Sequence, residues 1–364
     1  MARLPRIVPV LTLLASLGAA ACDPGETGSP TPLTFRVGVL ALMEGPMTAI
    51  SGLPTLEGAR MAAEEINAAG GVVVDGHPRL IELIDVQHRL RVEDVTTAAR
   101  DLINRDSVHV LLGPQLSQHA IPVGAVAERA GVPMISPMSS NPATTQGRRY
   151  VFRMAFLDRA QSRVLAQIGR ERLGLERVGV VSDRTSPYSQ EVSARFVESF
   201  RALGGQVVES SFPGGGPPAW RRAFSEVLAA APERVLLPLQ TEQVLEFMRL
   251  VEEEGLDVGA LQWMWTVPEP RARDFVDRYR RTYGEPPRST AALTYDALHL
   301  FSQAAAAAGS LDGIALRDAI RNLDGFQGVT GPVEFDDSGD PTRKVVVSRI
   351  DENGATYVTS VDAG

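Results

Sequence analysis

Residues 108–135 read VHVLLGPQLSQHAIPVGAVAERAGVPMI, and they contain the unit from which the whole fold is built. The apolar run Val108–Leu112 predicts a short buried strand, and residues 118–130 predict a helix. A second apolar run, Val132–Ile135, predicts another strand soon after that helix ends. A strand, a helix and a strand with short connections form a right-handed βαβ unit, in which the two strands lie parallel in one sheet.

The same alternation runs through both halves of the chain. In the first half, the β-rich run Phe35–Leu40 is followed by apolar residues at helical spacing from Leu56 to Ile66, and Asp75-Gly76 marks a hairpin turn. The second half predicts strands at 178–181, 207–210, 234–237 and 262–266, and helices at 160–172, 189–203, 219–230 and 241–254. We therefore expect an α/β fold with two Rossmann-like lobes, each built around a parallel sheet.

The C-terminal part departs from this alternation. It predicts helices at 268–283, 290–308 and 314–322, and strands at 329–335, 344–350 and 355–359. Asn353-Gly354 predicts a hairpin between the last two strands. The acidic cluster Asp336–Asp340 is similar to part of a calcium loop but lacks the distal glutamate of such loops. We interpret it as a solvated hairpin tip.

Residues 1–21 have the features of a secretory signal peptide. Arg3 and Arg6 precede the almost wholly apolar run Ile7–Leu17, and small residues follow up to Ala21. The apolar run is too short to span a bilayer comfortably, which favours cleavage over a permanent membrane helix. We therefore expect an exported protein.

Cys22 is the single cysteine of the chain, and it stands directly after the predicted signal peptide. This position resembles that of the lipid-modified cysteine of bacterial lipoproteins, although Ala19 stands where those proteins usually have leucine. Residues 23–32 contain glycine, proline, serine and threonine but nothing apolar, so we expect residues 22–33 to form a flexible tether. The alternative is ordinary secretion with Cys22 unmodified.

Composition excludes several classes of function. The formal net charge is −8 and becomes −10 when the two arginines of the signal are removed, which disfavours nucleic acid as a partner. With one cysteine no intrachain disulfide forms. The sequence has no Gly-x-Ser-x-Gly elbow, no phosphate-binding loop with lysine and no zinc-binding His-Glu-x-x-His motif, and its five histidines are scattered. We expect neither an enzyme nor a metal or other cofactor.

Small hydroxyl residues follow both strands of the opening unit. Gly113–Ser117 follows the first strand, and Ser136–Pro142 follows the second. If the strands are neighbours, both loops open at the same sheet edge and offer hydroxyls, backbone N–H groups and a helix N-terminus, an arrangement that suits a carboxylate. The alternative is that Ser117 and Ser140 only cap their helices. For the two serines together we favour ligand binding.

The chain resembles the leucine/isoleucine/valine-binding type of periplasmic receptor from about Leu33 to Thr359. The resemblance rests on the order and spacing of several short motifs: Val37-Gly-Val-Leu, Gly45-Pro46, Glu57-Gly-Ala, Glu65-Ile-Asn, Gly70-Gly71, Gly113-Pro114 to Ser117, and Pro133-Met-Ile-Ser136-Pro137 to Asn141-Pro142. It implies two α/β lobes joined by three chain crossings, the type I periplasmic binding protein fold. Lobe one would comprise residues 34–155 and 286–343, and lobe two residues 156–285 and 344–361.

The resemblance also implies a ligand site. Ser117, Ser139 and Ser140 match the residues that hold the ligand carboxylate on lobe one. Tyr188 matches an aromatic residue that closes over the ligand from lobe two, the alternative being that it only packs at a helix start. Two positions depart from the family pattern. Gln240 stands where members often have tyrosine, and Glu269, about two residues late, is the only acidic residue placed to pair with a ligand ammonium.

These observations predict a lipid-anchored, monomeric binding protein that faces the periplasm or the cell exterior. It would capture a small carboxylate-bearing ligand, an amino acid of the branched-chain type or a related one, and deliver it to a membrane permease of the ABC type. The alternative is an anchored protein of the same fold that regulates an envelope enzyme such as a cell-wall synthase. An exported hydrolase is the weakest alternative.

Overall fold

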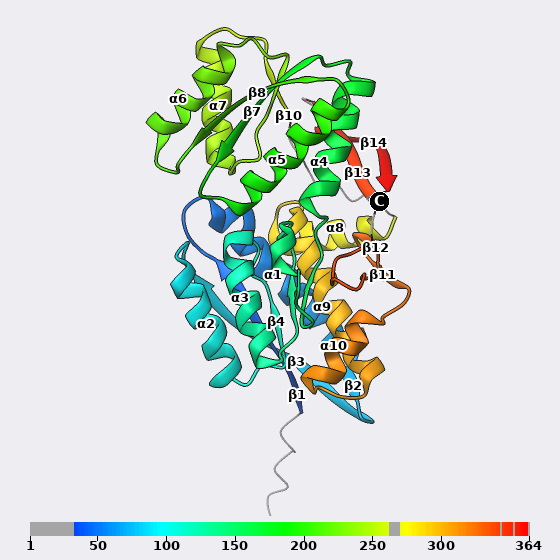
Figure 1. Ribbon diagram of the computed structural model, residues 1–364. Helices are drawn as coiled ribbons and strands as arrows, with labels where there is room; N and C mark the ends of the chain where they lie inside the picture. Colours follow the sequence, from blue (N-terminus) through cyan, green and yellow to red (C-terminus); the bar gives the residue numbers. More distant parts are fainter. Residues whose placement is uncertain (1–32, 262–269, 343, 352–353, 363–364) are drawn as a thin grey trace, which may run out of the picture. The chain divides into compact units, whose positions relative to one another are not determined.

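The computed structural model describes residues 33–261, 270–342, 344–351 and 354–362. The predicted signal peptide, Cys22 and Glu269 lie outside the described residues, as does the predicted tether except for Leu33. Within the described part, strands and helices alternate and form two α/β lobes (Figure 1). In that part no helix combines the length and apolar character that a membrane span requires.

The sheet of lobe one has six strands in the described part of the chain, in the order β2-β3-β1-β4-β5-β6. Every neighbouring pair is parallel except β2 and β3, which form the predicted hairpin. Sequence analysis did not predict β6. The strands are β1 (Thr34–Leu42), β2 (Val72–Val74), β3 (His77–His88), β4 (Val110–Leu112), β5 (Met134–Ser136) and β6 (Val151–Arg153).

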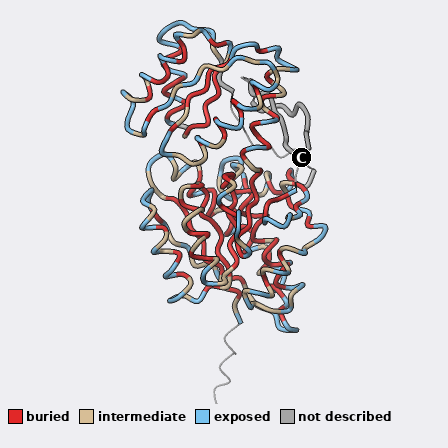
Figure 2. Tube along the Cα trace, viewed as in Figure 1, coloured by how far each residue is buried: buried red, intermediate tan, exposed pale blue. Residues whose placement is uncertain are grey.

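Helices cover both faces of this sheet, because side chains along a strand alternate between its faces. Val39 of β1 lies in a core shared with α1 and α9, whereas its neighbour Leu40 lies in a core shared with α2 and α3. Figure 2 shows the buried residues concentrated along the strands. The helices of this lobe are α1 (Leu53–Ala68), α2 (Val92–Asn104), α3 (Ser117–Ala130), α9 (Ser289–Ala308) and α10 (Gly313–Arg321).

Lobe two is built on a parallel sheet with the order β10-β9-β7-β8. Its elements in chain order are α4 (Asp158–Gln167), β7 (Arg177–Asp183), α5 (Pro187–Ala202), β8 (Gln206–Phe212), α6 (Pro217–Leu228), β9 (Arg234–Leu236), α7 (Thr241–Glu253) and β10 (Gly259–Leu261). The strand predicted at 262–266 lies outside the described residues, and β10 is formed by the three residues before it.

Helix α8 (Pro270–Tyr283) packs against lobe one, although the sequence analysis assigned its residues to lobe two. The boundary expected at residue 285 places it in lobe two, but Phe275 and Tyr279 lie in the core that α1 and α9 share. The Tyr279 hydroxyl also donates a hydrogen bond to the carboxylate of Glu57 in α1. We therefore place α8 with lobe one. The predicted divisions at 155/156 and 343/344 stay predictions.

The last described strands form two hairpins, β11 (Phe326–Gly328) with β12 (Gly331–Val333), and β13 (Lys344–Asp351) with β14 (Gly354–Asp362). The strand predicted at 329–335 is wrong in its first part. Val329 and Thr330 form a turn instead, because their backbone N–H groups donate to the carboxylate of Asp296 at 2.8 Å each.

The acidic cluster Asp336–Asp340 is a turn, as predicted, and Asp336 Oδ1 accepts hydrogen bonds from the backbone N–H groups of Ser338 and Asp340. Its interpretation as a solvated tip is wrong for Asp340, which is buried. The side chain of Asp340 pairs with an arginine of lobe one, and this contact helps to shape the candidate site.

Candidate functional site

Two loops meet at the carboxyl ends of β4 and β5. The strands are neighbours, with Leu112 paired to Ile135, so the condition for a shared sheet edge is met. The Ser136 hydroxyl donates to the carbonyl oxygen of Pro114 at 2.6 Å, which joins one loop directly to the other. Ser136 Oγ also accepts from the Ser139 N–H at 3.2 Å, which fixes the turn that carries Ser139 and Ser140.

Ser117 is the first residue of α3 and is buried. Its Oγ accepts hydrogen bonds from the Ser139 hydroxyl at 3.0 Å and from the Asn141 N–H at 3.4 Å. Because Ser139 gives its only proton to Ser117, the 2.6 Å contact between Ser139 and Thr144 requires Thr144 to donate. None of these contacts uses the hydroxyl proton of Ser117, which is therefore available to a bound anion.

The helix-capping alternative is wrong for both serines. The N-cap residue of α3 is Leu116, and no side chain caps this helix. The short helical turn Pro142–Thr144 is capped by the side chain of Asn141, which accepts from the Ala143 N–H at 2.9 Å. Ser117 and Ser140 therefore have no capping role that would explain their positions.

A cavity of about 210 Å³ brings together residues of both lobes. Ser117 and Ser140 line it from lobe one, and Tyr188 and Gln240 line it from lobe two. Ser139 is not among the lining residues, because its hydroxyl is directed to Ser117 and Thr144. The remaining lining residues are Met47, Ile50, Ser51, Gln115, Leu116, Gln118, Met138, Gln161, Ser186, Leu239 and Thr290.

Tyr188 and Gln240, the two predicted site residues from lobe two, lie at the N-terminal ends of α5 and α7. Tyr188 is the second residue of α5 and packs partly against that lobe's core, while also lining the cavity. Burial raises the pKa of its hydroxyl above the ordinary range, so it is a neutral hydrogen-bonding group at physiological pH. Gln240 caps α7, and its backbone N–H donates to Gln243 Oε1 at 2.9 Å. Packing at the start of α5 therefore accounts for only some of the contacts of Tyr188, because the side chain also lines the cavity.

Ser51 and Gln115 also line the cavity, and sequence analysis did not select them. Both are buried, and in the described part of the chain neither Ser51 Oγ nor Gln115 Oε1 has a hydrogen-bond partner. The amide nitrogen of Gln115 donates to the carbonyl oxygen of Leu40 at 3.1 Å, which fixes the side chain. Gln115 could have been found from its place in the Gly113–Ser117 loop, whereas Ser51 carries no such signal.

Asp158, the first residue of α4, is a buried carboxylate beside the site. Neither of its oxygens has a hydrogen-bond partner among the described residues that meets ordinary geometry. Burial raises its pKa to about 7, and the Ser140 side chain and the charge of Arg153 oppose that rise. The same carboxylate contributes to the raised pKa of Tyr188. The lobe junction therefore contains an acid that is easily protonated near neutral pH.

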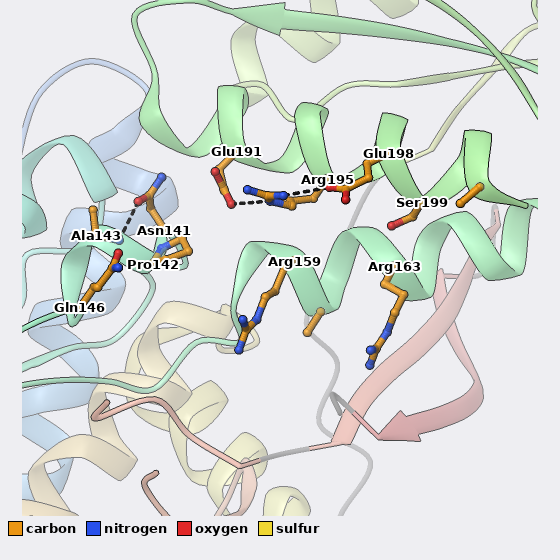
Figure 3. Close-up of a pocket in the computed structure, with 12 residues that line it drawn as sticks. Asn141, Pro142, Ala143, Gln146, Arg159, Arg163, Glu191, Arg195, Glu198 and Ser199 are labelled. Carbon is orange, nitrogen blue, oxygen red and sulfur yellow. Dashed lines mark hydrogen bonds and ion pairs between the residues drawn. The ribbon is translucent and has the colours of Figure 1, made fainter. Parts of the chain in front are cut away.

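A larger groove of about 910 Å³ lies beside this junction (Figure 3). Arg195 of α5 pairs there with Glu191 at 2.9 Å and Glu198 at 2.8 Å, and Arg159 and Arg163 of α4 line the same groove. None of the predicted ligand-binding residues lines it. Among the described residues, Ser117, Ser140, Tyr188 and Gln240 line the smaller cavity instead.

The described residues contain no cluster of three or more histidine, cysteine, aspartate or glutamate side chains arranged to hold a metal ion. The chemistry of the cavity is instead that of hydroxyls, amides and one tyrosine beside apolar walls from Met47, Ile50, Met138 and Leu239. Such a site orients a small ligand through a few polar contacts.

Comparison with known proteins gives a consistent result. A family model described as "Periplasmic binding protein" matches residues 34–261 and 257–355. The chain is 28% identical over 176 residues to the leucine-specific-binding protein of Salmonella typhimurium, a match that covers 48% of this chain and spans only 44% of that relative.

Two longer similarities cover most of the chain. The leucine-, isoleucine-, valine-, threonine- and alanine-binding protein of Pseudomonas aeruginosa is 23% identical over 332 residues, which cover 84% of this chain and 87% of that protein. The crystal structure of a leucine-binding protein from Thermotoga maritima superimposes with a TM-score of 0.83 at 26% identity, covering 90% of this chain and 99% of that one.

Proposed function

The chain belongs to the periplasmic binding protein family, and on this premise we propose that it captures a small carboxylate-bearing ligand between its two lobes. The ligand class is an amino acid of the branched-chain type or a related one. The names of the relatives support this class, since those proteins are named for the binding of leucine, isoleucine, valine, threonine and alanine. The family and the fold are those of binding proteins rather than enzymes.

One observation carries the proposal. The cavity is lined by Ser117 and Ser140 from lobe one and by Tyr188 and Gln240 from lobe two. A site divided in this way is complete only when both lobes contribute. Ligand binding is then coupled to closure about the hinge, because the closed form gains the contacts of lobe two.

We assign the carboxylate to the serine side of the cavity. The Ser117 hydroxyl proton is not used by the neighbouring groups, and the N-terminus of α3 adds backbone N–H groups and the positive end of a helix dipole. This arrangement stabilises negative charge without an arginine or lysine. Ser139 acts as a positioning residue, because its hydroxyl donates to Ser117.

Recognition of an α-amino group is assigned to Gln115. Glu269, the predicted partner of the ammonium, lies outside the described residues. Gln115 Oε1 lies in the cavity lining, is fixed by the side-chain contact to Leu40 and has no hydrogen-bond partner among the described residues, and leaving a buried acceptor unsatisfied is costly. An ammonium of the ligand supplies the missing hydrogen bond.

The exported hydrolase is disfavoured by the surroundings of Ser117. The hydroxyl contacts found among the described residues are with Ser139 and Asn141, and neither of these groups is a general base. We keep anchoring through Cys22, a monomeric state and delivery to an ABC permease as parts of the proposal. A mass spectrum of the mature N-terminus from a membrane fraction tests the anchor, and an unmodified Cys22 would remove it.

Thermal unfolding against a panel of ligands tests the proposed function. Leucine, isoleucine, valine, threonine and alanine are compared with leucinamide, which has the same side chain and amino group but no carboxylate. A ligand at a hundredfold excess over its Kd stabilises the folded state by about 2.7 kcal/mol. We expect stabilisation by at least one amino acid and none by leucinamide. Equal stabilisation by leucine and leucinamide, or none by any carboxylate, would contradict the proposal.

A further inference from the structure

Asp158 links the start of lobe two to the proposed carboxylate site. It is the first residue of α4, it has no exposed surface, and its backbone N–H donates to the carbonyl oxygen of Ser140 at 3.1 Å. Ser140 lines the cavity on the side that we assign to the ligand carboxylate. A buried acid is therefore in direct contact with a residue of the proposed site.

The carboxyl group of Asp158 lacks the partners that a buried carboxylate needs. Neither of its oxygens has a hydrogen-bond partner of ordinary geometry among the described residues. Burial raises its pKa to about 7, even though a contact with the Ser140 side chain and the charge of Arg153 favour the ionised form. A carboxyl group in this position is stabilised by keeping its proton, because burying an unpaired charge is costly.

Two charged groups act on the Asp158 carboxyl group, and each already has a partner of opposite charge. Arg153 Nε of β6 is 2.6 Å from the carboxylate of Asp340. Glu191 of α5 pairs with Arg195 at 2.9 Å, as Figure 3 shows. The two pairs together carry no net charge, so an ionised Asp158 adds a negative charge that they do not compensate.

The cavity itself offers no cation to a ligand carboxylate. Its lining, in the part of the chain that the structure describes, includes no lysine, arginine, histidine, aspartate or glutamate. Tyr188 lines it, but burial raises the pKa of that hydroxyl above the ordinary range, so it stays neutral near pH 7. A ligand carboxylate that enters the cavity therefore meets a buried acid. Two neighbouring carboxylates in a desolvated region do not both stay ionised, so the acid of the protein keeps its proton.

We propose that Asp158 is a positioning residue that carries a proton in the ligand-bound state and directs the Ser140 hydroxyl to the ligand carboxylate. A protonated Asp158 donates its hydrogen to Ser140 Oγ, and Ser140 then donates its own hydrogen to the ligand. An ionised Asp158 instead accepts from Ser140, which leaves no hydroxyl proton for the ligand. Binding is therefore coupled to the uptake of a proton from solvent by Asp158. This inference rests on the proposed carboxylate site and adds a proton to its binding reaction.

Calorimetric titration at pH 7 in phosphate and in imidazole buffer tests the proposal, with the tightest ligand among leucine, isoleucine, valine, threonine and alanine. The buffers differ in their heats of ionisation, so the difference between the two binding enthalpies gives the number of protons exchanged. Because the free-state pKa of Asp158 is about 7 and the bound state keeps its proton, we expect uptake of about half a proton per ligand. An exchange of zero would overturn the inference. Release of protons would also overturn it, because the ammonium of the ligand rather than its carboxylate would then lie nearest to Asp158.

The pH profile of affinity gives a second readout, which a purely structural role would not change. Wild-type affinity should fall by about fivefold or more between pH 6 and pH 8.5, because the bound state needs a proton that becomes scarcer. Asp158→Asn retains a donor for Ser140 but does not titrate, so it should exchange no proton and keep one affinity across this range. Asp324→Asn, the same change at an exposed acid outside the cavity lining, should keep the wild-type profile.

The outcomes separate this inference from the proposed function. Wild-type binding that is independent of pH would overturn the inference while the carboxylate site stands. A pH dependence that Asp158→Asn retains would also overturn it, because another group would then titrate. Binding of none of the five amino acids at any pH in this range would overturn both.

Discussion

Arg153 and Asp340 form a buried ion pair, with Arg153 Nε 2.6 Å from Asp340 Oδ1, although they lie in distant parts of the chain. Arg153 ends β6, and its side chain has no exposed surface. The same guanidinium donates to the carbonyl oxygen of Asn141 at 2.8 Å and to the Thr145 hydroxyl at 2.5 Å. The pair therefore supports the loop that carries Ser139 and Ser140 of the candidate site.

Asp340→Asn should lower the free energy of unfolding by about 3–5 kcal/mol, because it leaves the charge of Arg153 buried without a partner. Urea denaturation monitored by tryptophan fluorescence measures this change. Glu209→Gln is the control, since it removes an acid from the exposed pair with Arg201 and should have a small effect. Similar losses for the two variants would show that the buried pair has no special role.

Asp158 should make folding stability depend on pH. Its folded-state pKa is about 7, above the ordinary value of 3.8, so the unfolded chain loses the proton first as pH rises. Stability is therefore lost between about pH 4 and pH 7, by on the order of 4 kcal/mol in total. Asp158→Asn removes this loss. Arg153, Glu191 and Tyr188 are the charged or titratable groups coupled to Asp158 and stay unchanged.

Urea denaturation of the wild type and Asp158→Asn at pH 5 and pH 8 measures the difference. We expect the variant to gain more stability relative to the wild type at pH 8 than at pH 5. An equal difference at the two pH values would mean that the carboxyl group does not titrate with a raised pKa.

Much of the architecture could be predicted from short apolar runs. The pairing of Leu112 with Ile135 confirms that the two serine-bearing loops share one sheet edge. Ser117, Ser140, Tyr188 and Gln240 line one cavity, and their role as ligand contacts stays a prediction. These positions could be predicted from the sequence because each lies in a loop or in the first helical turn after a predicted strand.

The missed features depend on contacts between distant residues. The burial of Asp340 follows from its pairing with Arg153, and nothing in the local sequence indicates it. The three-residue strand that ends at Arg153 is too short for a periodic pattern. Helix α8 has an apolar side, but only the position of Glu57 and its neighbours decides which lobe that side contacts.

Gly58→Ala should destabilise the protein by about 1–3 kcal/mol or more. A Cβ atom at this position would lie 2.2 Å from the carbonyl oxygen of Ala291, so α1 and α9 would have to separate. Thermal denaturation measures the loss. Gly216→Ala is the control, because its Cβ would meet only Pro218 Cδ at 3.9 Å and its φ of −96° suits alanine. Equal unfolding temperatures for the two variants would contradict the close helix contact.

Tyr188→Ala should weaken ligand binding by about 10–100-fold, mainly through faster dissociation, because the side chain lines the cavity from lobe two and would be lost as a ligand contact. Tyr188→Phe keeps the ring and should retain most of the affinity if packing dominates. Stopped-flow fluorescence with the tightest ligand of the panel separates association from dissociation. An unchanged dissociation rate in Tyr188→Ala would confine Tyr188 to packing at the start of α5.

Calorimetric titration of Ser117→Ala with the tightest ligand of the panel tests the carboxylate site most directly. Ser193→Ala is the matched control, since Ser193 is also buried in a helix of the described chain but does not line the cavity. The account predicts that Ser117→Ala loses 1.5–3 kcal/mol of binding free energy, about 10–150-fold in Kd, while Ser193→Ala binds as the wild type does. Wild-type affinity in a folded Ser117→Ala protein would contradict it.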